Sequence, residues 1–267
     1  MKKIFKRISC TFGINAFLTL GAAQYIILLI NFMIALPQVI CVKSLRPLHK
    51  RMSRITRIRF GEYVFFIDCK YSDEIIQEDS FAFGAVVELY IENCYFKHHE
   101  VDFSQIKNVI DLGANRGLFS CLVANFCEKV VCVEPQKHFH NALIRNMAIN
   151  RRTNYVIEGS FVGGEGKLRG YNSNITTIEE IMQKNNFAAV DFLKIDIEGS
   201  EFGLFEKISC LEKIRYLTME VHRDYGDISK IINKLKGSGF SVILCDNYCD
   251  ITSKPGAINY IYAYNTK

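Results

Sequence analysis

The sequence predicts an α/β fold: a mostly parallel sheet with helices on both faces, preceded by an apolar amino-terminal segment. Strand-like and helix-like patterns alternate from about residue 107 onward, which is typical of a parallel sheet. Two buried strands also run into acidic loops, at 109–120 and 190–201. At 267 residues and 49% hydrophobic, the chain is long enough for one α/β core of about 200 residues with a remainder at the front.

The expected elements follow the alternation of the pattern. Strands are expected near 107–111, 129–133, 153–158, 190–196, 214–221, 239–245 and 257–264. Helices are expected near 117–127, 136–149, 176–185, 199–208 and 227–236. Upstream, 61–69 predicts a strand and 81–91 a strand or a helix.

Four parts follow from this pattern and from the charges. They are a basic tail and membrane segment at 1–43, a basic juxtamembrane linker at 44–60, an amino-terminal cap at 61–106 and the main domain at 107–267.

The first acidic loop, in VIDLGANRGLFS, has the character of a ligand-binding turn. The strand ends at Asp111, and Gly113, Ala114, Asn115 and Gly117 follow before an apolar helix. Glycines permit positive φ and let backbone N–H groups approach a ligand. The G-x-x-x-G spacing departs from the G-x-G-x-x-G dinucleotide fingerprint, so a pyrophosphate site is disfavoured. An acid two residues before the first glycine suits a ligand with a cationic sulfonium and an ammonium group.

A second acid supports an adenosine cofactor. The strand KVVCV at 129–133 ends in Glu134, which is placed to accept hydrogen bonds from both ribose hydroxyls. Nicotinamide cofactors need such an acid too, so Glu134 alone does not distinguish between classes of adenosine cofactor. It does so only together with Asp111 and the altered glycine spacing.

The second acidic loop, in VDFLKIDIEGSE, is expected beside the first. Ligands in open α/β sheets bind at the carboxyl ends of strands where the winding reverses, and 107–111 and 190–196 would be neighbours there. Strand alternation places Lys194 and Asp196 on one face. Lys194 and Asp196 either take part in catalysis or have a structural role. In the structural alternative, a Lys194–Asp196 or Lys194–Glu198 ion pair holds the loop.

These residues resemble the FkbM-type methyltransferase family. The motifs DLGANRG, VEP, TIEE at 177–180, DFLKIDIEGSE and MEVH at 219–222 occur in that family's order and at similar spacing. The resemblance covers roughly residues 80–250, and K-I-D-x-E-G-x-E is its most specific part. It implies the class I Rossmann-like methyltransferase fold with a seven-stranded sheet, S-adenosyl-L-methionine (SAM) as cofactor, and methylation of a hydroxyl on a sugar, glycan, lipid-linked or natural-product acceptor.

Two segments depart from the family pattern. Gln136 follows Glu-Pro where Asn or Asp is frequent, and GSFVGGEGKL at 159–168, which contains the candidate cofactor residue Ser160, is a loose match.

Methyl transfer requires an aligned acceptor oxygen and a base for its proton. The candidates are Asp196, Glu198, Glu201 and His222, with Lys194 beside them. His222 ends the expected fifth strand, and its unperturbed pKa near 6.5 suits a base. Alternatively, His222 is a rim histidine bonded to a backbone group, and Glu198 and Glu201 stabilise the start of the next helix.

Two other functions stay open at this point. One is a different adenosine-cofactor enzyme, such as a reductase. The other is a membrane-bound scaffold that has kept the fold without catalysis.

The apolar segment 14–42 predicts a membrane anchor. No charged residue lies between Arg7 and Lys43, and about 20 apolar residues span a bilayer core. The stretch is longer than the apolar region of a cleaved signal, although a signal and a buried or interfacial helix remain alternatives. Four basic residues precede the segment and seven follow it within 43–59, which favours a cytoplasmic main domain. A re-entrant helix bent at Pro37 is the other topology.

The basic cluster at 43–59 accounts for the net charge of +5 and should contact anionic headgroups. Nucleic acid is not expected as a partner, since no recognised module is present. The ten cysteines show no C-x-x-C and no histidine at zinc spacing, so we expect no zinc motif and a reducing compartment. The oligomeric state does not follow from the sequence.

Overall fold

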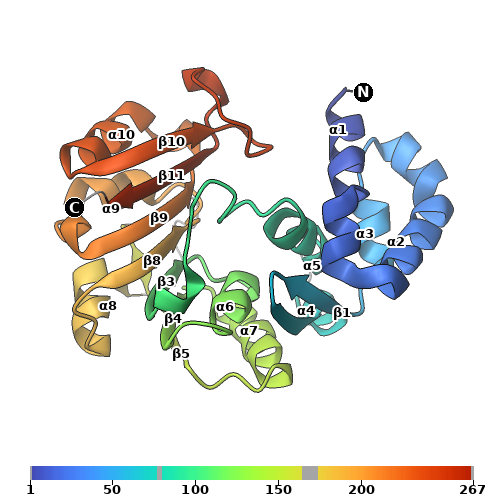
Figure 1. The fold of residues 1–267 in the computed structure, drawn as a ribbon, viewed down its shortest axis with the longest axis horizontal. Coiled ribbons are helices and arrows are strands. Elements are labelled where there is room, and N and C mark those ends of the chain that lie inside the picture. The colour runs from blue at the N-terminus through green and yellow to red at the C-terminus, as the bar shows by residue number, and fades with distance from the viewer. Residues whose placement is uncertain (1, 77–79, 164–173, 266–267) are drawn as a thin grey trace. The chain divides into compact units, whose positions relative to one another are not determined.

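The computed structural model of the chain describes residues 2–76, 80–163 and 174–265. The chain forms two compact units that interleave in sequence (Figure 1). The first contains Met1–Cys94, Arg116–Leu122 and His138–Thr153, and the second contains Tyr95–Asn115, Val123–Lys137 and Asn154–Lys267.

The second unit is built on a seven-stranded sheet with the order β10-β11-β9-β8-β3-β4-β5. The strands are β3 (Asn108–Leu112), β4 (Lys129–Val133), β5 (Tyr155–Glu158), β8 (Val190–Ile195), β9 (Ile214–Glu220), β10 (Phe240–Cys245) and β11 (Tyr260–Asn265). All neighbours are parallel except β11, which runs antiparallel to β9 and β10. This mostly parallel sheet with one reversed strand is a methyltransferase-like α/β fold. The expected neighbours β3 and β8 do pair, with Asp111 opposite Lys194.

Three helices cover one face of this sheet: α8 (Ile178–Asn185), α9 (Glu201–Lys207) and α10 (Ile228–Gly237). Their apolar residues share one buried core with alternate residues of the strands, such as Leu193 and Leu217. Helix α8 begins with a capping box in which Thr177 and Glu180 satisfy each other's backbone N–H groups. The remaining elements are the short strands β6 (Phe161–Val162) and β7 (Ile175–Thr176) and the 3-10 turns η2 (Phe103–Gln105), η3 (Leu211–Lys213), η4 (Arg223–Tyr225) and η5 (Pro255–Ala257).

The other face of the sheet carries an aromatic layer from the segment that precedes β3. Phe96 and His99 lie against Phe192 of β8, with ring centroids 4.7 and 5.6 Å away. His99 Nε2 lies 2.8 Å from the Thr218 hydroxyl, and burial lowers the pKa of His99 to about 4. This histidine is therefore a neutral packing residue that fastens the segment to β9.

The first unit contains the helices α1 (Lys2–Thr11), α2 (Ile14–Val42), α3 (Arg46–Arg51), α4 (Cys69–Ile75), α5 (Ala82–Val86), η1 (Val87–Ile91, a π-helix), α6 (Leu118–Val123, all but its last residue) and α7 (Lys137–Ile149, from its second residue). It also contains an antiparallel hairpin of β1 (Ile55–Phe60) and β2 (Tyr63–Asp68). The amide side chain of Asn150 bonds both the N–H and the carbonyl of Phe66, and Asn146 accepts from the N–H of Asp68. Asn146 of α7 and Asn150, the residue after its end, thus attach this helix directly to β2.

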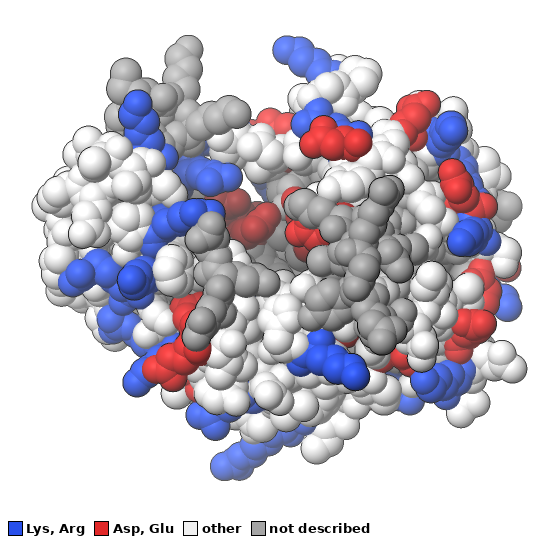
Figure 2. All heavy atoms as spheres, turned by 180° about the vertical axis from the view of Figure 1, so that it is seen from behind, with Lys and Arg blue, Asp and Glu red and all other residues white. Residues whose placement is uncertain are grey.

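Helix α2 is long and mostly exposed. Its backbone breaks at Gly21, and Pro37, the bend expected for a re-entrant helix, lies inside the helix. From residue 22 to residue 42 the helix spans about 30 Å at 1.5 Å per residue. One side packs on β1, α3 and η1, and the other exposes large apolar residues, among them Ile26, Ile30 and Ile34. Figure 2 shows a wide uncharged area on the first unit, with Lys and Arg side chains next to it. By length and composition, α2 could cross a membrane.

Most expected elements are confirmed within a few residues of their limits, and 81–91 proves helical. Segment 44–60, expected to be a linker, contains α3 and β1. Thr56 and Ile58 are buried in β1, while basic residues occupy other positions of the strand. Because of these charges, the sequence predicted a linker there and not a strand. The limits of the four parts of the sequence stay a prediction. Coverage of the second face of the sheet by helices also stays a prediction, because α6 and α7 belong mainly to the first unit. The described part of the chain contains no disulfide between any of the ten cysteines.

Gly113→Ala should destabilise the fold because the turn after β3 lies against the end of β8. A Cβ at this position would lie 1.7 Å from the carbonyl oxygen of Asp196, and φ is +77°. We expect a loss of about 1–3 kcal/mol or more in the free energy of unfolding of the detergent-solubilised chain. Gly61→Ala is the matched control, since φ is +57° there and no atom lies within 4 Å. Equal unfolding midpoints for the two variants would contradict this account of the turn.

Candidate active site

Lys194 joins the two acidic strand ends. Its ammonium lies 3.1 Å from Asp111 Oδ1 and 3.7 Å from Asp196 Oδ2, and it donates hydrogen bonds to the carbonyls of Leu112 and Gly113 at 3.2 and 2.7 Å. Burial lowers the pKa of Lys194, but the charges of Asp111 and Asp196 outweigh it, so the pKa is raised overall. The expected Lys194–Asp196 pair is present, and Asp111 is a second partner that the sequence did not reveal.

Asp111 is fully buried at the end of β3, with 0% of its surface exposed. The expectation was a carboxylate facing a cationic ligand. The structure gives Asp111 the role of a partner for Lys194, and direct contact with a ligand stays a prediction.

Glu134 lies buried at the end of β4, as the strand pattern predicts. Its Oε2 accepts from the N–H of Asn115 at 2.8 Å, and its Oε1 accepts from the N–H of Gln136 at 2.9 Å. Burial raises the pKa of Glu134 to about 7, and the charge of Asp111 adds to the increase. The two hydrogen bonds and the charge of Lys194 lower the pKa, but they do not offset the effect of burial. Each carboxylate oxygen has a second lone pair, so Glu134 can accept from ligand hydroxyls as well.

The remaining candidate cofactor residues fall in different surroundings. Gly113 and Ala114 donate their N–H groups to the carbonyl of Val133 at 2.9 and 3.0 Å, which anchors the turn on β4. Ser160 is buried after β5, and its hydroxyl donates to Glu158 Oε1 at 2.6 Å. Gly117 precedes α6 and belongs to the first unit, with φ of +74°. Residues 164–168 of the loosely matching segment lie outside the described residues.

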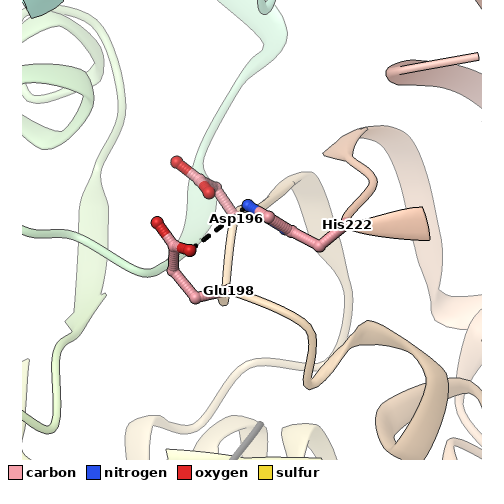
Figure 3. A group of neighbouring side chains, drawn as sticks. All are labelled: Asp196, Glu198 and His222. Atoms are coloured by element: carbon pink, nitrogen blue, oxygen red, sulfur yellow. Dashed lines mark ion pairs between the residues drawn. The ribbon is translucent and has the colours of Figure 1, made fainter. Parts of the chain in front are cut away.

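Asp196, Glu198 and His222 come together from the ends of two adjacent strands (Figure 3). Asp196 follows β8, Glu198 lies in the loop before α9, and His222 follows β9. One ligand atom from each lies within 4.8 Å of the others, and His222 Nε2 is 3.5 Å from Glu198 Oε2. Carboxylates and an imidazole at this edge can bind a cation or take a proton from a hydroxyl.

A fully buried carboxylate orients His222. Glu201, in the first turn of α9, has no exposed surface, and its Oε1 lies 2.8 Å from His222 Nδ1. A carboxylate accepts, so Nδ1 carries a proton, and in the neutral imidazole Nε2 is the acceptor. Burial lowers the pKa of His222, but the bond and charge of Glu201 and the charges of Asp196 and Glu198 raise it above its ordinary value. The partner of the histidine is therefore a carboxylate, where the structural alternative expected a backbone group.

Sequence reasoning missed two features of this site. Tyr95 donates its hydroxyl to Asp196 Oδ2 at 3.2 Å, and its ring lies 5.5 Å from the Lys194 ammonium. Nothing in the local sequence relates residues so far apart. Glu201 was considered as a base or a helix-start acid, and only the proximity of α9 to the end of β9 reveals it as the partner of His222.

Residues 111–242 match the family model described as the methyltransferase FkbM domain. The FkbM resemblance is confirmed over these residues. The FkbM match includes the strand ends that carry Asp111, Glu134, Asp196 and His222. No curated protein matches the chain.

Several solved structures are similar to the chain. One is the methyltransferase FkbM from Methylobacillus flagellatus KT, with 20% identity and a TM-score of 0.47, covering 67% of this chain. The chain spans about half of that protein, 52% of its length. A Streptococcus mutans protein described as a methyltransferase, in complex with SAH, shows 13% identity, 61% and 93% coverage and a TM-score of 0.41. A Klebsiella pneumoniae protein described as an O-methyltransferase shows 10% identity, 74% and 88% coverage and a TM-score of 0.45. The fold assignment rests on the strand order given above.

Lys194→Met should destabilise the chain strongly because it leaves Asp111 buried without its cation. Breaking a buried pair in this way typically costs about 3–5 kcal/mol. Chemical denaturation followed by circular dichroism measures the loss, and the double variant Lys194→Met/Asp111→Asn should recover part of it. Lys107→Met, which removes an exposed pair with Glu128, should change stability by about 1 kcal/mol or less. A Lys194→Met variant as stable as the Lys107→Met control would contradict the proposed importance of the pair.

Proposed function

We propose that the chain is a membrane-attached, SAM-dependent O-methyltransferase that acts on a hydroxyl of a sugar, glycan, lipid-linked or natural-product acceptor. The observation that carries the proposal is the pairing of a buried acid at the end of β4 with a carboxylate and imidazole cluster at the ends of β8 and β9. The FkbM match over residues 111–242 supports the reaction type.

The residues present fit the adenosine part of SAM. Glu134 is a buried carboxylate acceptor at the end of β4, and such an acid suits the two hydroxyls of a ribose. The turn at Gly113 has no room for a Cβ, so its backbone lies close against β8 at the same edge of the sheet. Gly113, Ala114, Asn115, Glu134 and Ser160 would hold the cofactor, and Asp111 would act through Lys194.

The reaction requires alignment and removal of one proton. When bound, the cofactor supplies a methyl group activated by a sulfonium. Asp196 and Glu198 would align the acceptor hydroxyl, and His222 Nε2, oriented by Glu201, or one of the two carboxylates would accept its proton. Transfer would break the carbon–sulfur bond of the cofactor and form the carbon–oxygen bond of the product, with a neutral thioether as the leaving group.

Cofactor affinity should depend on the ionisation of Glu134. Ribose hydroxyls donate to the carboxylate, so the ligand favours the ionised form, and the raised pKa of about 7 leaves Glu134 mostly protonated at pH 6. We expect the affinity for S-adenosylhomocysteine (SAH), measured by calorimetry on the full chain in detergent, to increase roughly tenfold from pH 6 to pH 8.

Two variants make this test specific. Glu134→Ala should weaken SAH binding at every pH, and Glu134→Gln should remove the part of the pH dependence that belongs to this residue. If the folded wild-type chain binds no SAH, or if Glu134→Ala binds it equally well, the cofactor assignment fails.

We further propose that α2 attaches the chain to a membrane, with the following basic segment 43–59 at anionic headgroups and the catalytic residues on the cytoplasmic side. Exposed apolar residues along α2 support the proposal, because water is a poor solvent for such a surface. An anchored enzyme would meet acceptors that are themselves at the membrane.

Three lysines on the exposed side of α2 should release the chain from membranes. Ile26→Lys, Ile30→Lys and Ile34→Lys together place charges where each would cost about 2.5–3.5 kcal/mol in a bilayer. The matched control replaces three isoleucines exposed elsewhere, Ile144, Ile175 and Ile251, by Lys. Carbonate extraction should leave the wild type and the control in the membrane fraction and the α2 variant in the supernatant. A wild-type chain that is soluble without detergent would end the anchor proposal.

A further inference from the structure

The cluster of Asp196, Glu198 and His222 has the composition of a cation site. Its three ligand atoms lie within 4.8 Å of one another and come from two neighbouring strand ends (Figure 3). No metal motif is visible in the sequence, because the spacing between Glu198 and His222 is set by α9 and β9. The site exists only in the folded chain.

Glu201 provides an observation independent of the three ligands. It is fully buried and binds the Nδ1 side of the imidazole at 2.8 Å, which leaves the Nε2 lone pair on the side of Glu198. Metal-binding histidines in proteins usually donate the N–H that does not face the metal to a carboxylate, a backbone carbonyl or a water, and Glu201 is such a partner. Oε2 of Glu201 has no hydrogen-bond partner among the described residues, so its negative charge is poorly compensated.

Asp196 is also arranged to accept a ligand. Tyr95 and Lys194 both contact its Oδ2, and among the described residues no contact occupies Oδ1. Glu198 is the exposed member of the cluster, with 46% of its side chain accessible, so an ion can reach the site from solvent.

Four carboxylates lie in and around the cluster: Asp111, Asp196, Glu198 and Glu201. Lys194 contacts the first two, and His222 contacts the last two. The carboxylates of Asp196 and Glu198 would attract a divalent cation to the position between them and His222.

We propose that Asp196, Glu198 and His222 Nε2 bind a divalent cation of the Mn²⁺ type, with Glu201 as the positioning residue for His222. Carboxylates suit Mg²⁺ and Mn²⁺, and imidazole suits transition metals, so Mn²⁺ satisfies both ligand types. Three protein ligands leave coordination positions for water or for oxygens of an acceptor.

The use of this cation in catalysis rests on the proposed function, whereas its binding does not. A cation held by Asp196, Glu198 and His222 would lower the pKa of a coordinated hydroxyl and hold its oxygen in place. His222 would then serve as a ligand, and the hydroxyl proton would pass to solvent. An acceptor with two adjacent hydroxyls, such as a sugar, would fit a cation with several open positions.

The test is Mn²⁺ binding to the full chain in detergent after removal of metals with EDTA. Electron paramagnetic resonance of free Mn²⁺ should show one saturable site per chain. Asp196→Asn, Glu198→Gln and His222→Ala should each weaken binding by at least about 100-fold, and Glu201→Gln by about 10–100-fold. Asp224→Asn, which removes an exposed acid two residues after His222, is the matched control and should bind as the wild type does.

SAH calorimetry on the same preparations separates this proposal from the proposed function. Glu198→Gln is isosteric and largely exposed, so retained SAH binding will show that this variant is folded. Absence of a saturable Mn²⁺ site in a wild type that binds SAH, or unchanged Mn²⁺ affinity in Glu198→Gln, overturns the metal site alone. A chain that binds Mn²⁺ and no SAH overturns the proposed function and leaves the metal site standing.

Discussion

The rest of the site depends on the contacts that the Lys194 ammonium makes. The ammonium lies between Asp111 and Asp196, and it also bonds the carbonyls of Leu112 and Gly113, so one buried cation holds the ends of β3 and β8 together. The two loops are thereby fixed at a distance that leaves no room for a Cβ on Gly113. Asp196 is positioned by the same contact, because Lys194 and Tyr95 constrain one of its oxygens and leave the other available.

The two sides of this contact have different chemistry. On one side, β3 and β4 present a turn and a buried acid, Glu134, whose hydrogen bonds come from backbone N–H groups. On the other side, β8 and β9 present Asp196, Glu198 and His222, with Glu201 buried behind the imidazole. A buried carboxylate suits binding of hydroxyl donors, and a carboxylate and imidazole cluster suits reaction at a hydroxyl or binding of a cation.

Local patterns were enough to predict the seven strands of the large sheet and their order along the chain, and the rule for ligand sites in open α/β sheets predicted that β3 and β8 are neighbours. Periodicity and the acidic strand ends carry that information within a few residues. Contacts across the sheet were not predictable in the same way: the Asp111–Lys194 pair follows from strand register, and Tyr95 reaches Asp196 from a segment before the sheet. Strand β1 was concealed because its arginines suggested a solvated linker, although Thr56 and Ile58 are buried.

A crystal structure of the full chain with SAH bound is the decisive measurement for the cofactor site. We expect the ribose hydroxyls to lie on Glu134 and the sulfur to lie at the sheet edge beside Gly113 and Asp196, facing the cluster with His222. A structure with SAH bound away from the ends of β3 and β4, or with Glu134 contacting no part of the ligand, would contradict this assignment.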